Sequence, residues 1–243
     1  MKTQETTFES AYKTWKGEWA GGGALKMRLQ GNTMAFEYRP IFYFDESCGW
    51  DGAKQQSVMA NCAEAYRRWE GEYDIHGRTL TLVLNVCPEI TEHKRAANVR
   101  FLPDKGSRST MVPRSLIWRR NHCCVVTYRA HDMYRLDSYV AQHELGHVLG
   151  IFDAYGYGGH FKGKYVLGVS LEKLANKLLP AAPFELTPRE SIMRAGGPVT
   201  PLEAEMILLA WSRGRLQLYT KSALTLLGAQ VGVQGASNAA RTA

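Results

Sequence analysis

The sequence predicts an α+β fold in which a twisted mixed sheet is combined with an internal helix and a C-terminal helix. Two hydrophobic periodicities and a globular composition support this class. Apolar residues alternate with polar ones over 78–86, as in a half-buried strand, and recur at helical spacing over 138–150. Of the 243 residues, 45% are apolar and 22% are charged, which excludes a disordered or collagen-like chain.

The first half of the chain is expected to form most of the sheet. Residues 24–30 and 33–39 flank the two-residue turn Gly31-Asn32, which predicts a hairpin that ends at Pro40. Further strands are expected over 41–44, 78–86 and 98–102. A helix is expected over 51–73, where apolar residues fall at helical spacing: Val58, Cys62, Ala65, Tyr66 and Trp69.

The second half is expected to add a second hairpin, from residues 116–119 and 123–129, and a short helix over 171–179. The strand over 123–128 is interpreted as a sheet edge that could pair with an extended peptide.

Helix ends are marked by capping residues. For the helix over 138–150, Asp137 or Ser138 is the expected N-cap and Gly150 the expected C-cap. A last helix is predicted from Pro201 to about Arg213, because Thr200 and Glu203 have the spacing of a capping box.

The charge and the cysteines leave several interpretations open. Lys and Arg exceed Asp and Glu by 30 − 23 = 7, but these residues are dispersed, so a solvated surface is favoured over nucleic-acid binding. The five cysteines are expected to be mainly small buried residues, and one disulfide, of Cys48 with Cys62 or Cys87, stays open.

No stretch of 18 or more apolar residues occurs, so no membrane span is expected, and residues 1–10 lack the apolar region typical of a secretory leader. The compartment stays open: cytosol, leaderless export, or secretion with the leader removed.

The segment H-E-L-G-H at 143–147 carries the chemistry. His143 and His147 are four residues apart on a predicted helix, so their Cβ atoms are about 5–6 Å apart and both rings can reach one Zn²⁺. Glu144 lies next to the first ligand, where it can take a proton from zinc-bound water. The spacing in this helical context predicts a zinc site.

A catalytic zinc site needs a third protein ligand. Gly150 lets the chain turn back, and Asp153, six residues after His147, can then reach the metal. His160, in a glycine-rich stretch, is the alternative third ligand.

The pattern His143-Glu144-x-x-His147-x-x-Gly150-x-x-Asp153 resembles the extended zinc motif of the metzincin metallopeptidases, closest to the snapalysin-like branch, in which the last residue is Asp. Met193, followed by the capped helix at Thr200, resembles the Met-turn that underlies the metal in that clan. A Tyr that stabilises the oxyanion in some members is replaced here by Ala195.

The resemblance implies a metzincin-like zincin fold and a zinc endopeptidase that acts on protein or peptide substrates. It implies an N-terminal extension over 1–33, a catalytic domain over 34–220 and a tail over 221–243. Two alternatives stay open: an inactive zinc-containing binding protein with a basic surface, and an effector or toxin protease of narrow specificity.

Overall fold

The computed structural model describes residues 7–9, 20–22, 24–103, 110–113, 124–129, 139–152, 165–166, 169–170, 191–195, 197–214, 216–217 and 219. The chain divides into two compact units. The first is Met1–Ile151 with Pro198–Gln217, and the second is Phe152–Gly197 with Leu218–Ala243. The elements predicted at 116–119 and 171–179 lie outside the described residues.

The predicted first hairpin is confirmed. Strand β2 (Leu25–Gln30) pairs antiparallel with β3 (Thr33–Tyr38), and β1 (Ala20–Gly22) pairs with the outer side of β2. Gly31, the first turn residue, has a φ of 58°, which suits the positive φ that the first central position of a type II′ turn requires. Alternate side chains of both strands are buried, so one face of this hairpin belongs to the core.

The strands of the first unit form two five-stranded sheets, and parallel pairs with the same register join the same two chain segments in both. Strand β3 pairs with β6 (Arg78–Val86), and β4 (Ile41–Phe44) pairs with β7 (Glu89–Ile90). The amide of Cys87 donates to the carbonyl of Tyr38 at 2.9 Å, and the amide of Glu89 donates to the carbonyl of Pro40 at 2.9 Å. The hydrogen bonds therefore run through the interruption at Pro40, although proline has no N–H to donate.

Asn98 completes the sheet where this interruption lies. It is 3% exposed, and its Oδ1 accepts from the amide of Ile41 at 2.7 Å. Its Nδ2 donates to the carbonyl of Arg39 at 3.4 Å. Leu25, the first residue of β2, is opposite Tyr38, and β8 (Val99–Leu102) pairs with β4 beyond the interruption. The buried Asn98 side chain thus takes the place of strand pairing between these two regions.

The predicted edge position of residues 123–128 is wrong. Strand β10 (Cys124–Arg129) pairs on one side with β8, in parallel, and on the other with β9 (Thr110–Pro113), antiparallel. Among the described residues, β9 is the outermost strand on this side of the sheet order β7-β4-β8-β10-β9. The hairpin partner of β10 is therefore β9, because its backbone supplies the antiparallel hydrogen bonds.

The first helix is shorter than the sequence predicts. Helix α2 covers Gly52–Arg67, and Asp51 caps it by accepting from the amide of Lys54 at 2.8 Å. Residues Gly71–Ile75 form strand β5, which pairs with β6 through the turn His76-Gly77. Both turn residues have positive φ, as a type I′ turn requires, so hairpin formation replaces the last part of the expected helix.

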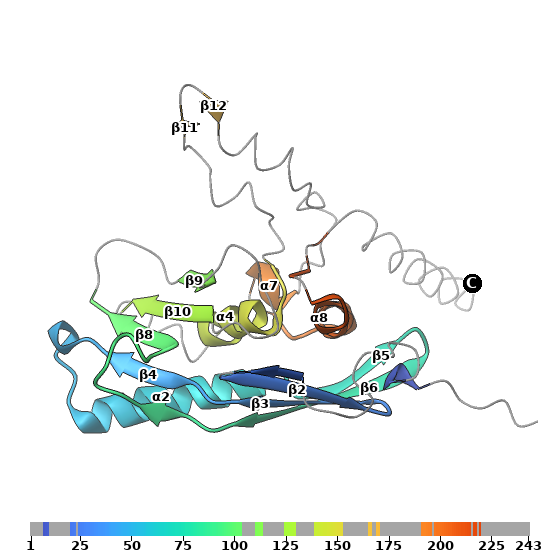
Figure 1. Cartoon of the computed structure of the whole chain (residues 1–243), viewed down its shortest axis with the longest axis horizontal. Coiled ribbons are helices and arrows are strands. Elements are labelled where there is room, and N and C mark those ends of the chain that lie inside the picture. Colours follow the sequence, from blue (N-terminus) through green and yellow to red (C-terminus); the bar gives the residue numbers. More distant parts are fainter. Residues whose placement is uncertain are drawn as a thin grey trace, which may run out of the picture. The chain divides into compact units, whose positions relative to one another are not determined.

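Two later helices of the first unit, labelled α4 and α8, lie to one side of strands β2, β3 and β6 (Figure 1). Phe36 contacts Trp211 of α8 (Pro201–Arg213), and Tyr38 contacts Tyr66 of α2, at ring-centroid distances of 5.6 and 5.5 Å. Both strand residues lie on the same, buried face of β3. Helix α4 (Val140–Leu149) packs next to α2 on this side. A mixed sheet with helices on its core face agrees with the α+β class predicted from the sequence.

Capping of α8 is confirmed and that of α4 is different. Thr200 and Glu203 form the predicted capping box at the start of α8. The N-cap of α4 is Tyr139, which makes no side-chain capping hydrogen bond, and the expected caps Asp137 and Ser138 lie outside the described residues. Gly150 is its left-handed C-cap, as predicted.

The second unit contains the short strands β11 (Tyr165–Val166) and β12 (Val169–Ser170), which pair antiparallel, and α7 (Ile192–Ala195). The first unit also contains the 3₁₀ turn η1 (Glu46–Cys48). No disulfide joins Cys48 to Cys62 or to Cys87, so the pairings considered from the sequence are not formed. No helix in the described ranges combines the length and apolar character that a bilayer crossing needs.

Candidate metal centre

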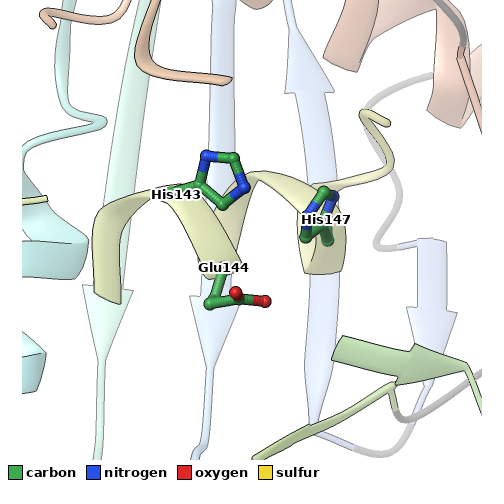
Figure 2. A group of neighbouring side chains, drawn as sticks. All are labelled: His143, Glu144 and His147. Atoms are coloured by element: carbon green, nitrogen blue, oxygen red, sulfur yellow. The ribbon is translucent and has the colours of Figure 1, made fainter. Parts of the chain in front are cut away.

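The structure brings His143, Glu144 and His147 together on α4 (Figure 2). One ligand atom from each of the three side chains lies within 4.8 Å of the others. The two imidazole centroids are 4.9 Å apart and the rings are nearly perpendicular, at 88°. In this view the His143 ring lies above the helix ribbon, the His147 ring lies one turn further along, and the Glu144 side chain extends below His143. This is the arrangement that the four-residue spacing predicts.

The tautomer of His147 is set by the backbone. Its Nδ1 lies 2.9 Å from the carbonyl oxygen of Ile151, and since a carbonyl can only accept, Nδ1 carries the proton and donates. In the neutral ring the lone pair is then on Nε2. A metal-binding histidine commonly has one nitrogen on the metal and the other donating to a carbonyl or carboxylate. His147 therefore has the chemistry of a metal ligand.

The helix that carries these residues is almost wholly buried. Glu144 and His147 are each 6% exposed, whereas His143 is half-buried and lies at the open side of the cluster. Buried imidazole and carboxylate groups are costly unless they bond to a partner or a metal. The two histidine nitrogens with a neighbouring carboxylate form a donor set that suits Zn²⁺.

Two buried tyrosines form a hydrogen-bonded pair, and one of them, Tyr128, interacts electrostatically with Glu144. The hydroxyl groups of Tyr66 and Tyr128 are 3.2 Å apart. Burial, followed by the nearby Cys62 thiol and the Glu144 carboxylate, raises the pKa of Tyr128 well above its usual value. Burial, followed by Tyr128, likewise raises the pKa of Tyr66. Both phenols stay neutral near pH 7, so they add polar O–H groups but no charge to the core.

The remaining candidates are placed differently. Asp153 and His160 lie outside the described residues, so the choice of third ligand stays a prediction. Met193 belongs to α7 in the second unit, where it is fully buried and its amide donates to Ser191 Oγ at 3.2 Å. Ser191 Oγ lies 3.4 Å from the Tyr219 hydroxyl of the same unit.

Two residues that the sequence did not mark hold the backbone of α4. Trp69 and Trp211 each donate an indole N–H to a carbonyl of this helix, at 2.8 and 3.1 Å. Their helical spacing predicted only burial. The signal that could have drawn attention to them is the residue type, because a buried indole N–H normally needs an acceptor.

Comparison with protein-family models, with curated proteins and with solved structures finds no match to this chain. The geometry alone shows a group of three side chains on α4 that could hold a metal ion, within a mixed α+β fold.

Proposed function

We propose that this protein is a zinc-dependent metalloendopeptidase of metzincin-like fold. The observation that carries the proposal is the buried cluster on α4, in which His147 has its Nδ1 bonded to a carbonyl and Glu144 lies next to the two imidazoles. His143 and His147 would hold the ion through ring nitrogens, and Asp153 is the third ligand that the motif favours. Bound zinc would supply Lewis-acid polarisation of the scissile carbonyl and of a water molecule.

Glu144 would act as the general base and then as the general acid. Its carboxylate takes a proton from the attacking water as the new C–O bond forms at the scissile carbon. It then gives that proton to the leaving amine as the C–N bond breaks, which returns the carboxylate to its ionised form. The 6% exposure of Glu144 keeps bulk water away from this proton transfer.

The substrate would bind along β9. This strand is outermost among the described residues on its side of the sheet, and α4 packs next to it in the same unit. An extended peptide that pairs with the free side of β9 would lie beside the helix that carries His143 and Glu144. This proposal replaces the edge expected at 123–128.

The order of elements also supports a metzincin-like fold. A strand, helix α2 and the long strand β6 precede the metal-binding helix, and the capped helix α8 follows. Met193 comes between the latter two in the chain, as the resemblance to a Met-turn implies.

The test compares Glu144→Gln with the wild-type chain. Glutamine keeps the volume of the buried side chain, so the variant should fold and hold zinc, while peptide cleavage should fall by about 10²-fold or more. Glu64→Gln, on the exposed surface of α2, is the matched control and should cleave like the wild type. Cleavage is measured on casein and on a mixed peptide library, so that narrow specificity is also detected.

Full activity of Glu144→Gln would contradict the assigned role. Absence of cleavage by the zinc-loaded wild type on every substrate would favour the inactive binding protein. Loss of zinc in Asp153→Ala but not in His160→Ala would identify the third ligand.

A further inference from the structure

Both ends of α4 receive a hydrogen bond from a buried tryptophan of another segment. Trp69, just after α2, donates from Nε1 to the carbonyl of Gln142 at 2.8 Å. Trp211, in α8, donates from Nε1 to the carbonyl of Leu149 at 3.1 Å. The two indoles are 0% and 1% exposed, so water does not compete for these bonds. They fix the helix backbone directly before His143 and two residues after His147.

At the C-terminal end, the Trp211 bond is part of a connected set. Leu149 O is one of the last four carbonyls of α4, which have no partner within the helix, and the indole satisfies it. The next carbonyl, of Gly150, accepts from the amide of Gln217 at 2.8 Å. Ile151 then pairs with Gln217, and its carbonyl accepts from His147 Nδ1. The ring of His147 is thus oriented by a carbonyl whose position depends on α8 and the residues after it.

At the N-terminal end, Trp69 is itself held in place. The hydroxyl of Tyr73 donates to the carbonyl of Trp69 at 2.8 Å, and Tyr73 is 7% exposed. The indole therefore approaches Gln142 from a fixed backbone. Since Gln142 directly precedes His143, this bond limits the rotation and axial shift of the helix at the first imidazole.

We propose that Trp69 and Trp211 are positioning residues that set the metal affinity of the His143 and His147 pair. They act through the backbone of α4 and touch neither the ion nor the substrate. This inference rests on the metal centre of the proposed function, but it needs no catalysis. Removal of either N–H lets the helix end move, so each imidazole spends less time in the metal-binding geometry.

The experiment uses Trp69→Phe and Trp211→Phe in the full chain. Phenylalanine keeps an aromatic ring but has no N–H. Zinc is titrated calorimetrically into protein from which metal has been removed by a chelator, and the visible absorption of bound Co²⁺ reports the coordination geometry. Each variant should bind zinc about three- to tenfold more weakly, the range for one lost hydrogen bond, with an altered Co²⁺ spectrum.

Trp50→Phe is the matched control. The Trp50 indole packs against Phe44 and Phe101, and in the described part of the chain its N–H has no hydrogen-bond partner. The same chemical change there should leave zinc affinity within about twofold and the Co²⁺ spectrum unchanged. Thermal unfolding of the metal-free variants separates a general loss of stability from a specific loss of metal affinity.

Unchanged zinc affinity in both folded variants would overturn the inference and leave the hydrolase proposal intact. Weaker zinc binding in both variants, together with no peptide cleavage by the wild type, would support the inference and contradict the hydrolase proposal. A wild-type chain that binds no metal would overturn both. If Trp69→Phe does not fold, Tyr73→Phe replaces it, with an expected weakening of about twofold; equal affinity to the wild type would then count against Trp69.

Discussion

Asn98 should contribute measurably to the stability of the first unit, because it replaces strand pairing where Pro40 interrupts the sheet. Asn98→Ala would remove the 2.7 Å bond from the Ile41 amide and the 3.4 Å bond to the Arg39 carbonyl. A fully buried polar group left without a partner costs about 1–3 kcal/mol. Ile41 is half-buried and Arg39 exposed, so water can partly replace both bonds. We expect a loss of about 1–3 kcal/mol in total, mostly from the Ile41 amide.

Urea unfolding followed by tryptophan fluorescence measures this loss, and hydrogen exchange locates it at the Ile41 amide. Asn98→Asp keeps the acceptor for Ile41 and loses the donor to Arg39, so it separates the two contributions. Asn85→Ala, at an exposed site on β6, is the control and should change stability by less than about 0.5 kcal/mol. A loss in Asn98→Ala no larger than in this control, with unchanged exchange at Ile41, would refute the reasoning.

Three further predictions concern the surroundings of α4 and α8. The pKa values of Tyr66 and Tyr128 are raised in the folded state, so the folded chain holds more protons than the unfolded chain above pH 10. The free energy of unfolding should therefore fall with rising pH there, by up to about 1.4 kcal/mol per pH unit for each tyrosine, and less steeply in the Phe variants; a flat profile in alkaline urea titrations would contradict this. Glu203→Ala removes the buried capping carboxylate of α8 and should cost about 1–3 kcal/mol in a thermal melt, whereas a neutral result would mean that the capping box contributes nothing. His76→Asn suits the positive φ of that turn and removes the 2.9 Å pairing with Glu205, so the change should stay below about 1 kcal/mol; a larger loss would show that this partly exposed pair is a major contact.

Local patterns in the sequence predicted the elements whose signals are local. The strand over 78–86 has the predicted bounds because the alternation of buried leucines spans only a few residues. The helix over 51–73 was overextended since Trp69 fits the helical spacing, while the competing signal, a positive-φ turn at His76-Gly77, lies beyond the helix. Propensity alone does not decide between a last helical turn and a paired strand such as β5.

Pairing partners were harder to predict. Residues 123–128 were interpreted as an edge because their own alternation does not reveal what lies on either side. The strand that covers them, β9, has only four residues and forms through backbone hydrogen bonds. Sequence patterns specify which face is buried but carry little information on lateral order.

The metal-binding group was predictable because H-E-x-x-H encodes its geometry within five residues of one helix. The contacts that orient it were not predictable. Ile151 acts through its carbonyl, which any residue would supply. The donors Trp69 and Trp211 are 73 and 62 residues away in sequence from their acceptors, and only the fold brings them to α4.

The most direct test of the central claim is the zinc content of the chain after equilibration with a small molar excess of zinc and exhaustive dialysis. We expect one ion per wild-type chain and none in the His143→Ala/His147→Ala double variant. Circular dichroism should show that both proteins are folded. A wild-type chain without zinc, or a double variant that retains a full equivalent, would contradict the claim.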